Sequence, residues 1–265
     1  TMPIIKDIAF SLSNYAKGIA LIRSLNLWRY FAIPLVISLV IAVLVFVGAW
    51  QAKTALSAYF TGIWPWAWGA TAFASLSGFI GSLGVLLLGF TLTKYLVLAF
   101  SAPFMSPVSE RIDRHLNPGH AMNPSSSFWG LLSRSLRLNI GNLFRELGLT
   151  LMLLILGLFP VIGLISAPLI FVVQAFYAGF GNLDYTLERY YDYRSSKSFL
   201  HQYRGLAIGN GLVFILISLI PVLGIILVLP LSVSAGTFTV LETIKSGDFS
   251  NTKNHGHTNP NYSKS

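Results

Sequence analysis

The apolar positions of this chain are gathered into long blocks separated by polar stretches. Two such blocks, 30–50 and 77–100, are mostly apolar, and Lys94 is the only charged residue in either of them. At 1.5 Å per helical residue, the first block would reach about 31 Å, enough to cross a hydrocarbon layer of about 30 Å. The pattern predicts an all-α integral membrane protein with two full transmembrane helices, 30–50 and 77–100. Lys94 lies near the end of the second, so it is either an anchor that reaches to the interface or a residue of a pore.

The second half of the chain is apolar but broken. The block 147–181 is interrupted at Pro160 and Gly163, and its first arm would reach only about 20 Å, which is short of a crossing. The motif L-x-P-V-x-G recurs at Pro221 and Gly224, and "IGN" precedes both copies. Such a repeat indicates two copies of one helix–turn–helix unit. We expect two re-entrant hairpins, 147–181 and 206–244, whose apolar turns are buried against other helices.

The basic residues predict the orientation. Lys53 is the only one between the two predicted spans, whereas the others precede the first span or lie at or beyond the end of the second. The positive-inside rule therefore places both termini in the cytoplasm. We expect one membrane domain, 1–245. Outside the predicted spans and hairpins, this domain comprises a cytoplasmic or interfacial N-terminus (1–29), a cytoplasmic loop with an amphipathic helix (101–146) and a cytoplasmic connector (182–205). A disordered tail (246–265) follows the domain.

The connector holds the densest group of charges, "GNLDYTLERYYDYR". Read as a helix, it would place Asp184, Glu188 and Asp192 in one acidic stripe. One interpretation is a solvated, salt-bridged helix end; the other is the charged vestibule of a pathway. The candidate vestibule residues are Asp184, Glu188, Arg189, Arg134 and Arg137. The two arginines Arg134 and Arg137 belong to the amphipathic helix predicted from Leu131, which we expect on the cytoplasmic membrane surface, where they would attract anions or lipid phosphates.

Composition excludes a soluble protein. Charged residues are 10% of the chain and apolar residues 54%, whereas soluble domains are about 25% charged. The net charge of +9 is explained by the cytoplasmic bias of basic residues and by anionic lipids rather than by nucleic acid. Cysteine is absent, so disulfides and thiolate metal sites are excluded.

No residue pattern predicts an enzyme, a cofactor or a metal. Ser109 near the "DRH" of 113–115 has hydrolase residue types, but there is no nucleophile elbow. His115 and His120 have no neighbouring residues with metal-ligand spacing. An ATP-binding loop is also absent from the sequence, so we expect passive transport or transport driven by an ion gradient.

Three motifs together resemble the CysZ sulfate-permease family, whose wider superfamily includes the eukaryotic etoposide-induced membrane proteins. They are "YAGFGNLDYTLERYYDYRSSKSF", "RGLAIGNG" and the repeated "PVxG" turns, and the likeness covers about 5–244. The resemblance implies two full transmembrane helices, hemi-penetrating hairpins and a homo-oligomer such as a hexamer. It also implies sulfate uptake for cysteine biosynthesis across a bacterial inner membrane.

The resemblance further implies an anion site. Members of that family bind sulfate near the start of the first long helix, at a Gly-Leu-Arg segment followed by another arginine. Here the segment reads "NLWRYFAIP", with Asn26 and Trp28 in place of the glycine and the first arginine, and Arg29 in place of the second. Arg29, Asn26 and Arg23 are therefore the candidate anion-binding residues. The predicted function is channel-like uptake of sulfate or a related oxyanion; the alternative is a non-transporting scaffold or lipid-interacting envelope protein.

Overall fold

The computed structural model describes residues 4–63, 68–118, 127–157, 160–220 and 223–246. Every regular element in this part of the chain is helical. In chain order they are α1 (Ile4–Ser24), η1 (Leu27–Phe31), α2 (Ala32–Ile63), α3 (Ala70–Leu116), α4 (Phe128–Leu156), α5 (Pro160–Leu187), α6 (Tyr193–Gln202), α7 (Arg204–Ser218) and α8 (Leu223–Lys245). Within the described ranges, four stretches are long and apolar enough to cross a membrane: Leu27–Tyr59, Phe128–Leu156, Gly163–Leu187 and Ile226–Lys245. The all-α membrane class is thus confirmed.

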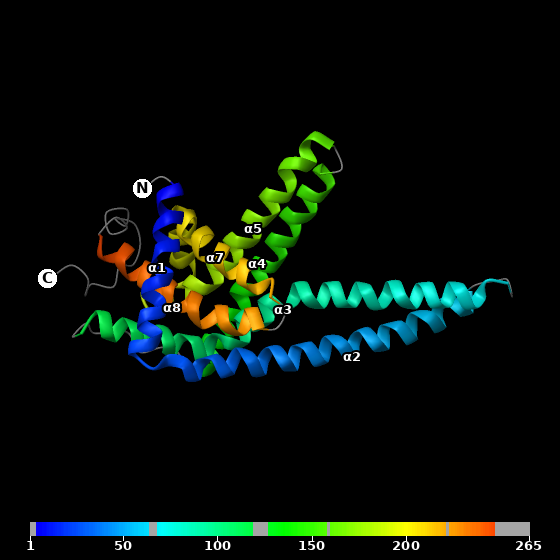
Figure 1. Ribbon diagram of the computed structural model, residues 1–265, viewed down its shortest axis with the longest axis horizontal. Helices are drawn as coiled ribbons and strands as arrows, with labels where there is room; N and C mark the ends of the chain where they lie inside the picture. The colour runs from blue at the N-terminus through cyan, green and yellow to red at the C-terminus, as the bar shows by residue number, and fades with distance from the viewer. Residues whose placement is uncertain (1–3, 64–67, 119–126, 158–159, 221–222, 247–265) are drawn as a thin grey trace.

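Helices α2 and α3 form a long antiparallel arm that extends away from the rest of the molecule (Figure 1). They contain 32 and 47 residues, or about 48 and 70 Å of helix. The predicted span 30–50 begins in η1 and continues in α2, whereas 77–100 lies inside α3, which continues to Leu116 through part of the predicted loop. The two helices approach closely at Gly81, where a Cβ would lie 2.8 Å from a methyl carbon of Leu56. Outward-facing side chains such as Leu44 and Phe46, each 65% exposed, give the arm an apolar surface.

Helices α4 and α5 form a second projecting pair (Figure 1). The prediction of a surface helix from Leu131 followed by a separate short arm from Leu147 is wrong, because both segments belong to one continuous α4 of 29 residues. No proline interrupts the sequence between them. With α5 at 28 residues, each helix reaches about 43 Å, so length does not argue against a crossing.

Helix α4 buries several polar side chains and exposes several apolar ones. Ile140 and Phe144 are 50% and 69% exposed. Four polar residues are buried: Ser135, Asn139, Asn142 and Glu146. Polar side chains that face protein are typical of helices in a membrane.

The predicted hairpin turns fall where paired helices meet. Pro160 is the first residue of α5, a position where proline suits a helix. A Cβ on Gly163 would lie 2.8 Å from the carbonyl oxygen of Gly157, and one on Gly224 would overlap the carbonyl of Ile217. The two glycines therefore occupy equivalent close contacts in the α4–α5 and α7–α8 pairs. Pro221 lies outside the described residues.

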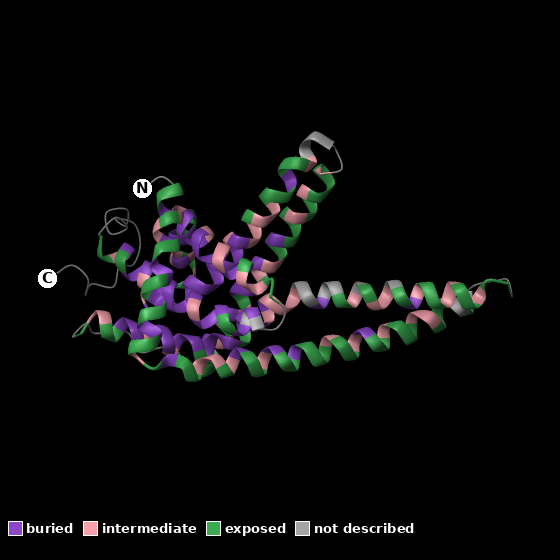
Figure 2. Ribbon diagram, in the orientation of Figure 1, coloured by how far each residue is buried: buried purple, intermediate pink, exposed green. Residues whose placement is uncertain are grey.

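The core of the molecule lies where α1, α5, α7 and α8 pack together, and buried residues concentrate there while the two arms are mainly exposed (Figure 2). Helices α5 and α7 nearly touch: a Cβ on Gly179 would lie 2.9 Å from the amide nitrogen of Gly211. Of the apolar window in Ile226–Lys245, 72% is buried. Helix α8 is thus surrounded mainly by protein.

The connector is not one acidic helix. Helix α5 ends at Leu187, and Asp192 is the N-cap of α6, where it accepts a hydrogen bond from the Ser195 amide at 3.1 Å. The predicted single stripe of Asp184, Glu188 and Asp192 is therefore wrong. The helix ends because side-chain capping by Asp192 offers the backbone an alternative to helix continuation.

Candidate functional site

The predicted anion-binding residues lie at the junction of α1 and η1. Asn26 has a left-handed backbone, with φ 50° and ψ 52°, and its amide donates to the Arg23 carbonyl at 3.3 Å. Asparagine is one of the few residues besides glycine that adopts this conformation readily. The bend redirects the chain from α1 into η1, which contains Arg29 and leads directly into α2. Arg23 and Arg29 are both exposed.

A third cation, which sequence reasoning missed, joins Arg29. The Arg29 guanidinium lies 5.1 Å from the centroid of the Tyr30 ring, and the guanidinium of Arg111 lies 6.0 Å from the same centroid. Arg111 comes from the polar end of α3 and is also exposed. Sequence reasoning did not identify Arg111 because it lies far from Arg29 along the chain, and only the fold brings the end of α3 beside η1. Two exposed guanidinium groups from different elements thus lie within 6.0 Å of one ring centroid, and guanidinium groups are suited to binding an oxyanion.

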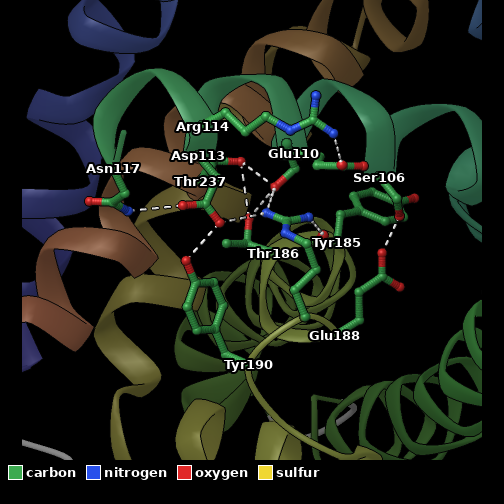
Figure 3. Close-up of polar contacts among 12 residues, drawn as sticks. Ser106, Glu110, Asp113, Arg114, Asn117, Tyr185, Thr186, Glu188, Tyr190 and Thr237 are labelled. Carbon is green, nitrogen blue, oxygen red and sulfur yellow. Dashed lines mark hydrogen bonds and ion pairs between the residues drawn. The ribbon is translucent and has the colours of Figure 1, made fainter. Parts of the chain in front are cut away.

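The predicted vestibule residue Arg189 is buried in a polar network between α3, α5 and α8 (Figure 3). Its Nη2 donates to Ser109 Oγ at 2.7 Å and lies 3.4 Å from Asp113 Oδ2, and its Nη1 donates to the Tyr185 carbonyl at 3.0 Å. Tyr190 Oη donates to the same Asp113 oxygen at 2.6 Å. The remaining members are Asn117, Thr186 and Thr237. The ion-paired side chains are 2% and 0% exposed, so the carboxylate depends on these donors for its hydrogen bonds.

A second ion pair joins α4 to α5. Arg134 binds Asp184 in a two-point fork, from Nε at 3.1 Å and from Nη2 at 2.8 Å. The same guanidinium donates to the Tyr191 carbonyl at 3.2 Å and to Ser196 Oγ at 2.8 Å. The pair is largely buried, with side chains 17% and 7% exposed. Arg134 therefore holds α4, α5 and α6 in one arrangement.

Glu188 follows α5 and receives a hydrogen bond from Ser106 of α3. Burial raises the pKa of Glu188 to about 8; the charge of Asp184 adds to this, whereas Ser106, Arg134 and Arg189 oppose it. Four of the five predicted vestibule residues thus meet in a buried region between α3 and α6. Arg137, the fifth, lies at the surface with its guanidinium 5.0 Å from the centroid of the Tyr193 ring. Salt bridges were predicted correctly, but solvation was not.

Another buried ion pair was missed. Lys94 Nζ lies 2.8 Å from both carboxylate oxygens of Glu146, and Tyr95 Oη donates to the same carboxylate. The interpretation of Lys94 as an anchor reaching to the interface is wrong, because its ammonium is bound to α4. A signal existed: Lys94 is the only charge in 77–100, and Glu146 is the only acid between Asp113 and Asp184. Lone opposite charges in apolar segments commonly pair.

The residue types that resembled hydrolase chemistry serve the buried network. Ser109 and Asp113 both contact Arg189, whereas His115 is exposed. His120 lies outside the described residues. Among the described residues, no group of three or more histidine, cysteine, aspartate or glutamate side chains is placed to hold a metal ion.

Comparison with known protein families gives a match. The family model described as sulfate transporter CysZ/etoposide-induced protein 2.4 matches residues 14–229. A search of curated proteins finds no match. The matched range runs from α1 into α8 and includes both cationic and buried parts of the candidate site.

Proposed function

Because the chain belongs to the sulfate transporter CysZ/etoposide-induced protein 2.4 family, we propose that it passes sulfate or a related oxyanion across a membrane into the cytoplasm. The observation that carries the proposal is the cationic site of Arg29 and Arg111 at Tyr30. It stands at the start of the first long helix, beside the left-handed bend at Asn26. Asparagine adopts the left-handed conformation that glycine would adopt at this position. The anion site is therefore retained, with Arg111 of α3 in place of the arginine that is missing from the segment.

Capture of the anion uses both guanidinium groups. An oxyanion accepts charge-assisted hydrogen bonds from each, and these are about twice as strong as neutral ones. Arg111 occupies the role that a neighbouring arginine would fill if position 28 were not tryptophan. Arg23, exposed in the last turn of α1, adds to the attractive field.

The α4–α5 pair dips into the membrane from the cytoplasmic side and returns. Its support is Arg145, which is exposed on the outer part of α4. From Arg145 to Leu156 the helix rises about 16 Å, about half of a 30 Å hydrocarbon layer. A full crossing would place this exposed guanidinium well inside lipid, at a cost of several kcal/mol. Both termini are cytoplasmic in this topology, the membrane is a bacterial inner membrane, and the protein acts as a homo-oligomer.

The buried charges form a gate below the capture site. Arg134 and Arg189 are each held by a carboxylate, Asp184 and Asp113 respectively. An anion moving inward would have to compete with these carboxylates, while a neutral Glu188 reduces the opposing charge. The same pairing favours a second candidate function, a non-transporting scaffold, because every buried cation of this region is already neutralised within the chain.

Uptake of radiolabelled sulfate into proteoliposomes tests the proposal. Arg29→Ala and Arg111→Ala should each reduce uptake at least tenfold, because each removes one charged donor to the anion. The matched control is Arg114→Ala, one helical turn beyond Arg111, whose side chain is 66% exposed and paired with Glu110. Uptake unchanged by Arg111→Ala would remove this site from the mechanism, and the absence of any sulfate or sulfite flux would favour the scaffold.

A further inference from the structure

A second cationic surface lies between α4 and α6, on other residues than the capture site. Arg137 lies over the ring of Tyr193, and Tyr193 Oη and Arg145 Nη1 are 3.9 and 3.3 Å from the position that a Cβ on Gly141 would take. The Arg145 guanidinium and the Tyr193 hydroxyl therefore lie beside a residue with no side chain, and the Arg137 guanidinium lies over the ring of the same tyrosine. We call this place beside Gly141 the cradle.

The positive charge extends along α6 to the start of α7. Arg204 Nε donates to the His201 carbonyl at 3.0 Å. The pKa of His201 is lowered by burial and then by the charges of Arg204, Lys197 and Arg145, so these three cations lie around the imidazole. The His201 imidazole also contacts the rings of Phe176 and Phe180. We define the α4–α6 basic patch as Arg137, Arg145, Lys197 and Arg204.

Two acidic residues near this patch are bound to other basic residues. Glu146 is bound to Lys94, and Asp184 is bound to Arg134. The patch itself contains four basic residues and no acidic one, so an anionic partner would complement its charge.

The surface beside the patch is apolar. Ile140 and Phe144, on α4 between Arg137 and Arg145, are 50% and 69% exposed, and Leu151 further along α4 is 60% exposed. A partner that fits must carry an anionic head and an apolar body. A soluble oxyanion satisfies only the first condition, and a zwitterionic lipid only the second.

We propose that the α4–α6 basic patch binds the phosphate headgroup of an anionic phospholipid, with the acyl chains lying along α4 from Phe144 toward Leu151. Arg137 and Arg145 fork onto the phosphate oxygens, and Tyr193 donates its hydroxyl over Gly141. Lys197 and Arg204 supply the surrounding field, at a level where juxtamembrane basic residues attract anionic lipid. The site is independent of which anion the protein transports.

Titration of the purified full-length protein in detergent tests this site. Short-chain phosphatidylglycerol should bind, whereas phosphatidylcholine of the same chain length and inorganic phosphate alone should not. Arg145→Gln should weaken phosphatidylglycerol binding about fivefold, while Lys6→Gln, which removes an exposed charge from α1, should not. The pKa of His201, followed by NMR, should rise when phosphatidylglycerol binds, because the lipid charge offsets the neighbouring cations.

A pair of glycine variants separates a specific site from general charge attraction. Gly141→Val fills the cradle without changing the charge and should weaken binding, whereas Gly148→Val, whose added atoms would meet nothing within 4 Å, should not. Equal binding of the two lipids, or unchanged binding in both Arg145→Gln and Gly141→Val, would overturn the proposal. Sulfate uptake by Arg145→Gln should match that of the wild type, so failure of this site is distinguishable from failure of the transport proposal.

Discussion

The Lys94–Glu146 ion pair allows a quantitative test of how α3 and α4 are held together. Its side chains are 14% and 5% exposed, and the ammonium contacts both carboxylate oxygens at 2.8 Å. Removing one partner of a buried pair leaves an uncompensated charge and costs about 3–5 kcal/mol, whereas replacing both by apolar residues is commonly neutral or stabilising. We therefore expect Lys94→Met alone to be strongly destabilising and Lys94→Met/Glu146→Leu to recover the loss.

The two single variants should differ. In Glu146→Leu the remaining lysine has a long flexible chain and can turn toward the interface, so part of the cost is recovered. In Lys94→Met the shorter glutamate cannot reach water and is left as a buried charge without a partner. Thermal unfolding in detergent measures both, and 3–5 kcal/mol corresponds to a fall in Tm of roughly 6–20 °C for a chain of this size.

A surface pair provides the control for this cycle. Arg114 and Glu110 are paired at i and i+4 on α3, with side chains 66% and 18% exposed. Removing Arg114 should change the free energy of unfolding by no more than about 0.5 kcal/mol. If Lys94→Met is as mild as Arg114→Met, and the double variant shows no coupling, then the ion pair does not hold α3 against α4 and the reasoning fails.

Two further predictions concern the connector and the core. Because the folded-state pKa of Glu188 is about 8 and lies above its unfolded value, the folded state binds more protons between about pH 4.5 and pH 8. Stability should therefore fall as the pH rises through this window, by about 1.4 kcal/mol for each unit of pKa shift. The free energy of unfolding at pH 5 and at pH 8 measures this change. The wild type must be less stable at pH 8, and Glu188→Gln should abolish the difference. Gly211→Leu should prevent α5 and α7 from packing and lower Tm by roughly 10 °C or more. The control Gly62→Leu, with nothing within 4 Å of its Cβ position, should fold normally. Equal Tm values for the two variants would exclude the close approach of α5 and α7 at Gly211.

The hydropathy pattern predicts the helices better than their ends. It locates the first long apolar helix and the repeated helix pairs, because lipid exposure demands continuous apolar surface over many residues. The pattern fails at Leu147, where the composition changes from mixed to apolar but α4 continues without a break. A helix boundary needs a cap or a breaker, and a shift from polar to apolar residues supplies neither.

Contacts between distant helices were beyond sequence reasoning. Arg29 and Asn26 were identified from their local segment, but Arg111 reaches Tyr30 only because α3 is long enough to return to η1. Likewise Asp113, considered from the sequence only as part of the "DRH" of 113–115, is the buried partner of Arg189. Charges in an apolar chain predict that pairs form, yet their partners depend on tertiary packing.

The buried pairs also determine how the molecule meets anions. Three acidic residues, Asp113, Glu146 and Asp184, are each buried against one basic residue. Each pair contributes no net charge, so the formal charge of +9 belongs entirely to the rest of the chain. Attraction of an oxyanion at Arg29 or of a lipid phosphate at Arg145 is then an effect of exposed charge and should weaken as salt shortens the Debye length. The interior pairs are screened much less, so high salt should reduce anion capture while leaving the helix packing intact.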